Sequence, residues 1–166
     1  GQLARNLATL RKHRGLFLAA LAYAYFMLIG AIFNLNIIVY GKGLMGLSEN
    51  RVALLLAVTG ASLAVGAGLS GHLSRRRVEL GVLPLGAFGL VLFPILLRYA
   101  QTSYAAVTAL VAGAGMSGGL FVVPLASYIQ LNCRPRERGR VMATWNFMNY
   151  VGVILGSGAF YLCTEP

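Results

Sequence analysis

The chain has 166 residues, of which 58% are hydrophobic and only 11% are charged. Soluble domains are roughly half apolar and about a quarter charged, so this composition predicts a polytopic membrane protein with an all-α fold. The formal net charge is +10, but the arginines stand between apolar runs and form no stripe with aromatic residues, which argues against a nucleic-acid partner.

The chain opens with a basic segment that leads into a long apolar run. Residues 1–14 place Leu3, Leu7 and Leu10 on one helical face, as in an amphipathic linker at the membrane surface, although a solvated linker is an alternative. Residues 15–40 are predicted to be the first span, and this run is too long for the apolar part of a signal peptide. The first residue is Gly, so we expect the chain to be part of a longer protein.

Further apolar runs predict four more transmembrane helices, at about 51–73, 81–98, 104–131 and 140–163. The membrane domain would then cover 15–166, with a glycine-rich turn after the first span. The run at 81–98 is short and carries Pro84 and Pro94, and we expect it to lie at the periphery, facing lipid. Small residues spaced four apart predict close helix packing. These pairs are Ala64/Gly68, Ala67/Gly71, Gly115/Gly119 and Gly152/Gly156.

The basic residues predict the orientation of the spans. Loops on one side of the membrane carry eleven of the 14 Lys and Arg residues, and the other side carries only Lys42, Arg51 and Arg98. Basic loops stay in the cytoplasm, so the amino terminus is predicted to be cytoplasmic and residue 166 to lie outside. Cys133 and Cys163 fall at opposite ends of the last span, too far apart for a disulfide.

Uncharged polar groups inside the apolar spans are the candidates for a transport pathway, because they are costly there unless they face a cavity or a partner. On the last span, Asn146, Asn149 and Tyr150 lie at positions i, i+3 and i+4 and therefore share one helical face. Interhelical hydrogen bonding, packing or a helix kink are the alternatives to a lining role. The candidate lining residues are Asn34, Asn36, Phe121, Pro124, Gln130, Asn146, Asn149 and Tyr150.

Catalytic chemistry is not expected in this chain. It has no Asp, and none of its four Glu lies inside an apolar run, so we expect no paired carboxylates there, and the His-x4-Asp dyad of a glycerolipid acyltransferase cannot be built from it. It also lacks a P-loop and a Rossmann glycine motif. We therefore expect no enzyme activity, no metal site and no cofactor.

The turn between the second and third spans carries a family resemblance. It reads G-x-L-S-R-R-R-x-E-x-G and resembles the Gly-x-Leu-small-Asp-Arg turn of the major facilitator superfamily. The sequence departs from this pattern at Arg75, where the family usually has an acidic residue. Glu79 is expected to pair with the basic residues in place of that acid. Positive-inside topology alone or contact with anionic lipid head groups would also explain this turn. The residues of this cytoplasmic basic turn are Gly71, Arg75, Arg76, Arg77, Glu79 and Gly81.

A closer resemblance is to the lysophospholipid transporter branch of that superfamily. It rests on RRVELGVLPLG (76–86), GGLFVVPLASYIQ (118–130) and ERGRVMATWNFMNY (137–150). The resemblance implies the carboxy-terminal half of a twelve-helix transporter, helices seven to eleven, in the inner membrane of a Gram-negative bacterium. Its substrate would be lysophospholipid, chiefly lysophosphatidylethanolamine, carried to the inner leaflet for reacylation.

The same resemblance implies the partners of this chain: the lysophospholipid, membrane lipids and the amino-terminal half of the transporter. Some members of the branch are fused to an acyltransferase and an acyl-carrier-protein synthetase. Two alternatives therefore stay open. One is a major facilitator transporter for another small molecule, such as a drug or a sugar. The other is the membrane anchor of a fused phospholipid acyltransferase.

Overall fold

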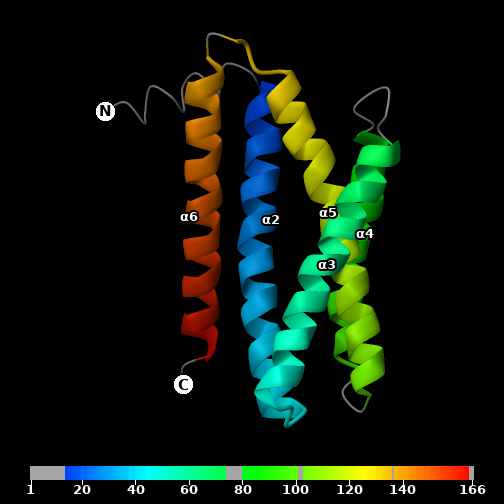
Figure 1. Cartoon of the computed structure of the whole chain (residues 1–166). Helices are drawn as coiled ribbons and strands as arrows, with labels where there is room; N and C mark the ends of the chain where they lie inside the picture. The colour runs from blue at the N-terminus through cyan, green and yellow to red at the C-terminus, as the bar shows by residue number, and fades with distance from the viewer. Residues whose placement is uncertain (1–13, 74–79, 101–102, 136, 165–166) are drawn as a thin grey trace. The chain divides into compact units, whose positions relative to one another are not determined.

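The computed structural model describes residues 14–73, 80–100, 103–135 and 137–164, and over these residues it contains helices and no strand (Figure 1). The predicted all-α fold is thus confirmed. The elements are α2 (Arg14–Val39), the π-helical turn η1 (Tyr40–Leu44), α3 (Glu49–Leu73), the 3-10 turn η2 (Leu80–Val82), α4 (Leu83–Leu97), α5 (Tyr104–Leu131) and α6 (Arg138–Thr164). The predicted amphipathic linker lies almost entirely outside the described residues.

Four stretches among the described residues are long and apolar enough to cross a membrane. They are Arg14–Leu44, Glu49–Leu73, Tyr104–Leu131 and Arg138–Thr164. The remaining predicted span, at 81–98, is shorter in the structure. Its helix α4 has only 15 residues, with Pro84 in the first turn. At 1.5 Å per residue this helix is only about 22 Å long, against a hydrocarbon core of about 30 Å.

The chain divides into two compact units. Unit 1 comprises residues 1–33 and 125–166, which include the first part of α2, the end of α5 and all of α6. Unit 2 comprises residues 34–124, with the end of α2, α3, α4 and most of α5. Both α2 and α5 run through the two units, and the division within α5 falls directly after Pro124.

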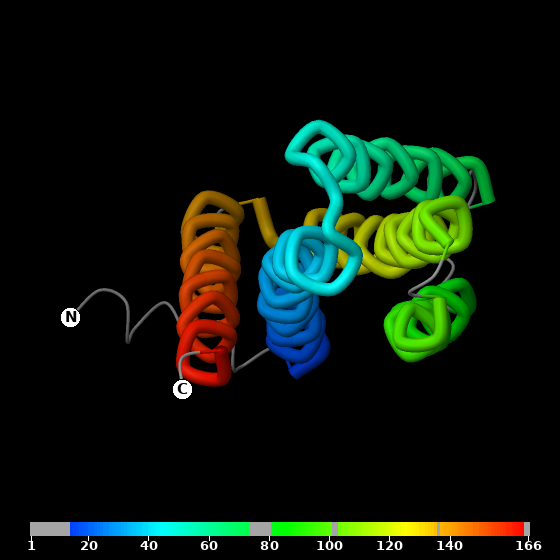
Figure 2. The backbone as a smooth tube through the Cα atoms, turned by 90° about the horizontal axis from the view of Figure 1, so that it is seen from below, coloured from blue at the N-terminus to red at the C-terminus, as the bar shows by residue number. Residues whose placement is uncertain are grey.

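In unit 1, α2 and α6 lie side by side (Figures 1 and 2). Gly152 and Gly156 of α6 face α2 so closely that a Cβ on either would collide with a carbonyl oxygen, that of Ala24 or Leu28. Small residues at this spacing let two backbones approach, so the predicted Gly152/Gly156 packing face is confirmed. Two turns before Gly152, the Trp145 ring packs edge to face against the Tyr23 ring at 4.9 Å between centroids, an arrangement that aromatic pairs prefer.

In unit 2, α5 packs between α3 and α4 (Figure 2). A Cβ on Gly115 would collide with Ser62 of α3, and one on Gly119 with Leu63, so this predicted pair is also confirmed. On the opposite face, a Cβ on Gly86 of α4 would lie 2.8 Å from the Phe121 amide nitrogen.

Of the two small-residue pairs predicted within α3, one member lies at a helix contact, because a Cβ on Gly119 of α5 would collide with the Ala67 backbone nitrogen. Gly68 and Gly71 are exposed, and a Cβ on either would meet nothing within 4 Å among the described residues. The packing position is instead Gly66, where a Cβ would collide with the Met116 carbonyl oxygen. This helix carries small residues on several faces, and their spacing alone does not distinguish the face that meets α5.

Hydrogen bonds tie the helix ends together at one end of unit 2. The Tyr40 hydroxyl donates to the Leu97 carbonyl oxygen at 2.9 Å, and the Tyr104 hydroxyl donates to that of Arg51 at 3.3 Å. In the turn before α3, Lys42 and Glu49 form an ion pair at 2.9 Å. Gly46 adopts a φ of 59° in this turn, a backbone conformation that glycine tolerates better than other residues.

Candidate functional site: an apolar groove and a polar hairpin pocket

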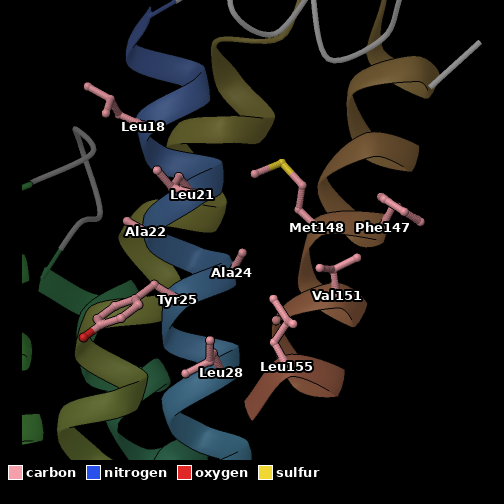
Figure 3. A pocket seen from close by; sticks show the side chains of 11 residues that line it. Leu18, Leu21, Ala22, Ala24, Tyr25, Leu28, Phe147, Met148, Val151 and Leu155 are labelled. Carbon is pink, nitrogen blue, oxygen red and sulfur yellow. The ribbon is translucent and has the colours of Figure 1, made fainter. Parts of the chain in front are cut away.

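An apolar groove runs along unit 1 between α2 and α6, and we call it the α2–α6 groove (Figure 3). Its volume is about 670 Å³, within the range of about 300–1,000 Å³ that is usual for small-molecule sites. Its lining comes from both helices: Leu18, Leu21, Ala22, Ala24, Tyr25, Leu28, Phe147, Met148, Val151, Gly152 and Leu155.

The sequence forms this groove by placing large apolar side chains beside small ones. On α2, Leu18, Leu21 and Tyr25 follow one another three and four residues apart and therefore share one face. On α6, Met148 and Leu155 extend toward α2 (Figure 3). The Tyr25 hydroxyl is the only polar side-chain group of the lining, and this side chain is 62% exposed.

Such a lining is almost entirely apolar and suits an apolar chain, with the Tyr25 hydroxyl as its one polar side-chain group. Across the described residues, no group of three or more His, Cys, Asp or Glu side chains lies close enough to hold a metal ion.

A second, polar hollow lies where α5 turns into α6, and we call it the hairpin pocket. It has a volume of about 450 Å³ and is lined by Ser127, Gln130, Leu131, Cys133 and Arg138. Burial raises the pKa of the Cys133 thiol above its ordinary value. The Arg138 guanidinium opposes this shift by stabilising the thiolate, and the Glu137 carboxylate adds to it.

The predicted lining residues fall at several places. Asn146 and Tyr150 are exposed on α6, Tyr150 by 71%. Asn149 is half-buried, and its Oδ1 has no hydrogen-bond partner among the described residues. These three residues share α6 with the groove but do not line it, and Gln130 lines the hairpin pocket.

The other predicted residues belong to unit 2. Asn34 and Asn36 are exposed near the end of α2, Phe121 is half-buried, and Pro124 is fully buried. The structure thus brings Asn146, Asn149 and Tyr150 together on one helix and does not gather all eight residues into one site. Their role in lining a pathway stays a prediction.

The predicted cytoplasmic basic turn lies mostly outside the described residues. Gly71 is exposed near the end of α3, and Gly81 is exposed in η2. Arg75, Arg76, Arg77 and Glu79 fall between these helices in the part that the structure does not describe, so their expected pairing stays a prediction.

The α2–α6 groove was not predicted from the sequence, because mainly polar residues within the spans were considered as candidates for a site. The available signal was the Gly152/Gly156 pair. Where two helices approach through small residues, the large apolar residues beside them stand apart and leave a hollow. The pair was predicted to be a packing face, but the hollow beside Val151 and Leu155, which directly precede the two glycines, was not predicted.

These helices, with their apolar outer faces and apolar groove, define a polytopic helical membrane protein. The family model of the Major Facilitator Superfamily matches residues 2–157, nearly the whole chain. The chain belongs to this superfamily, as the basic turn suggested, and this membership indicates a membrane transporter. No curated protein and no solved structure matches it.

Proposed function

We propose that this chain is the carboxy-terminal half of a transporter that moves lysophospholipid, chiefly lysophosphatidylethanolamine, across a bacterial inner membrane by alternating access. The observation that carries the proposal is the α2–α6 groove. Eleven residues line it, and their only polar side-chain group is one tyrosine hydroxyl. A sugar or another polar solute would lose its hydrogen bonds to water there without replacement, whereas a single acyl chain would lose none.

The polar residues near the groove fit the other part of such a substrate. Asn149 lies one residue from Met148 of the lining, and its buried oxygen accepts no hydrogen bond among the described residues. The ammonium group of an ethanolamine head group is a donor that such an oxygen can accept from. An amphiphile would thus place its chain in the groove and its head group toward the amides of α6.

The proposed transporter also has defined partners and a defined location in the membrane. The amino-terminal half of the transporter completes the pathway, membrane lipids surround the apolar outer faces, and the basic loops face the cytoplasm. This chain performs no chemical step, and any acylation of the product belongs to other domains.

The direct test is uptake of labelled lysophosphatidylethanolamine by proteoliposomes that carry the full-length protein. We expect uptake above that of empty liposomes. No uptake would overturn the proposal. Uptake of an apolar drug without uptake of the lysophospholipid would assign the protein to another substrate. Absence of both would favour the membrane-anchor alternative.

A matched pair of variants ties uptake to the groove. Val151→Trp fills the groove from α6, whereas Val153→Trp places the same ring on an exposed position of the same helix outside the lining. We expect uptake to fall several-fold in the first variant alone, at equal membrane abundance. Equal uptake by both variants would remove the groove from the pathway.

A further inference from the structure

The hairpin pocket is a polar hollow of unit 1 that the proposed transport mechanism does not use. Three of its lining side chains carry hydrogen-bond donors: the Ser127 hydroxyl, the Gln130 amide and the Arg138 guanidinium. None of its five lining residues has a carboxylate. Among the described residues, neither the Gln130 amide nor the Arg138 guanidinium takes part in a side-chain hydrogen bond or an ion pair, so both remain available to a ligand.

Most of the charged residues around the pocket are positive. Arg134 and Arg140 lie close to Arg138 in sequence and are exposed, and Glu137 is the one acid among the described residues of this hairpin. Arg138 also begins α6, a helix of 27 residues, whose free backbone amides and dipole add to the positive potential. A planar guanidinium beside hydroxyl and amide donors suits the oxygens of a phosphate group.

We propose that the hairpin pocket binds a phosphate group, with Arg138 as its main ligand and Gln130 and Ser127 as hydrogen-bond donors. The proposal stands on the pocket itself and does not require lysophospholipid transport. The phosphate has two possible sources, the head group of a phospholipid or free phosphate in solution, and their shared chemistry is an oxyanion that accepts several hydrogen bonds.

Cys133 provides a reporter inside the pocket. Its thiol lines the hollow together with Arg138, so an anion held there covers the thiol and also opposes its ionisation. Both effects slow alkylation. Cys163, near the other end of α6, is exposed and serves as the internal reference.

The experiment measures alkylation of Cys133 and Cys163 by N-ethylmaleimide in the full-length protein, with mass spectrometry of the two peptides. Three additions are compared at constant ionic strength: inorganic phosphate, lysophosphatidylethanolamine, and monoacylglycerol with the same acyl chain but no phosphate. We expect phosphate or the lysophospholipid to slow Cys133 several-fold and to leave Cys163 unchanged. Monoacylglycerol should have no effect.

The variants test whether Arg138 holds the anion. Protection is expressed as the rate without ligand divided by the rate with it, because Arg138→Gln also changes the unliganded rate. We expect protection to disappear in Arg138→Gln, to weaken in Gln130→Leu and to persist in Arg140→Gln. All three side chains are exposed, but Arg140 alone lies outside the lining. Gln130→Leu keeps the test decisive where Arg138→Gln does not fold.

The outcomes separate this proposal from the transport proposal. Protection by the lysophospholipid assigns the site to a lipid head group, and protection by inorganic phosphate alone assigns it to free phosphate. Both outcomes support the site, whether or not uptake is observed. No protection by either ligand, or equal protection in Arg138→Gln, Gln130→Leu and the unmodified protein, overturns it.

Discussion

The Asn149 side-chain oxygen, Oδ1, is buried and has no hydrogen-bond partner among the described residues. Leaving such a group unsatisfied costs about 1–3 kcal/mol, so packing alone does not explain an asparagine here. We expect Asn149→Ala, and likewise Asn146→Ala on the same face, to lower lysophospholipid uptake several-fold. Thermal stability in detergent should stay unchanged or rise in Asn149→Ala, because the orphan oxygen is removed.

Asn132→Ala is the matched control for these two variants. Asn132 is exposed beyond the end of α5, where its amide donates to the Tyr128 carbonyl oxygen. Uptake should therefore be unaffected by this change. If Asn146→Ala and Asn149→Ala transport as well as Asn132→Ala at equal membrane abundance, both residues serve packing.

The reactivity of the Cys133 thiol should depend on pH in a way set by its surroundings. Burial raises its pKa, so the thiolate forms at higher pH than in an ordinary cysteine, and alkylation of Cys133 should rise at correspondingly higher pH. Removing the cation in Arg138→Gln should move the pH–rate profile further upward. Glu137→Gln should move it downward, because the carboxylate destabilises the thiolate. Shifts in the same direction for both variants would contradict this account.

Helix packing in unit 1 depends on the glycine face of α6. A Cβ on Gly152 would collide with the Ala24 carbonyl oxygen, a backbone atom that cannot rotate away, whereas one on Gly158 would meet nothing within 4 Å among the described residues. Overpacking of this kind typically costs about 1–3 kcal/mol. We expect Gly152→Val to lower the apparent Tm in detergent by several degrees and Gly158→Val to change it little. Equal Tm values would show that α2 and α6 do not depend on this contact.

Pro124 marks the place where α5 passes from one unit to the other. A proline inside a helix removes one backbone hydrogen bond and makes bending easier at that point. Alternating access requires helices that bend, so Pro124→Ala should lower the uptake rate while membrane abundance is maintained. Pro94→Ala, which removes a proline inside α4 away from this boundary, should transport normally. Equal rates in both variants would argue against bending at Pro124.

The helices are predictable from the sequence because a bilayer requires long apolar runs that satisfy their own backbone hydrogen bonds. Each predicted span therefore overlaps one helix of the structure. The contact faces are less predictable. Gly115/Gly119 and Gly152/Gly156 meet a neighbouring helix, but Gly68 and Gly71 do not. The groove is missed altogether, since it depends on which apolar side chains of two helices far apart in sequence stand opposite each other.

Charge asymmetry predicts the orientation of the chain in the membrane. Eleven basic residues fall in loops or at helix ends that are predicted to face the cytoplasm, and three in those predicted to lie outside. The two cysteines test this directly, because Cys133 precedes α6 and Cys163 lies near its carboxyl end. With 27 residues, α6 is about 40 Å long, enough to place the two thiols on opposite sides of the membrane.

We expect a membrane-impermeant maleimide added to intact spheroplasts to label Cys163 and to leave Cys133 unlabelled. Permeabilised spheroplasts should show both thiols labelled, although Cys133 more slowly at neutral pH because its pKa is raised. Cys163→Ser and Cys133→Ser, each tested alone, assign the signals. Labelling of Cys133 in intact spheroplasts would reverse the predicted orientation, and the phosphate group proposed for the hairpin pocket would then come from the outer side of the membrane.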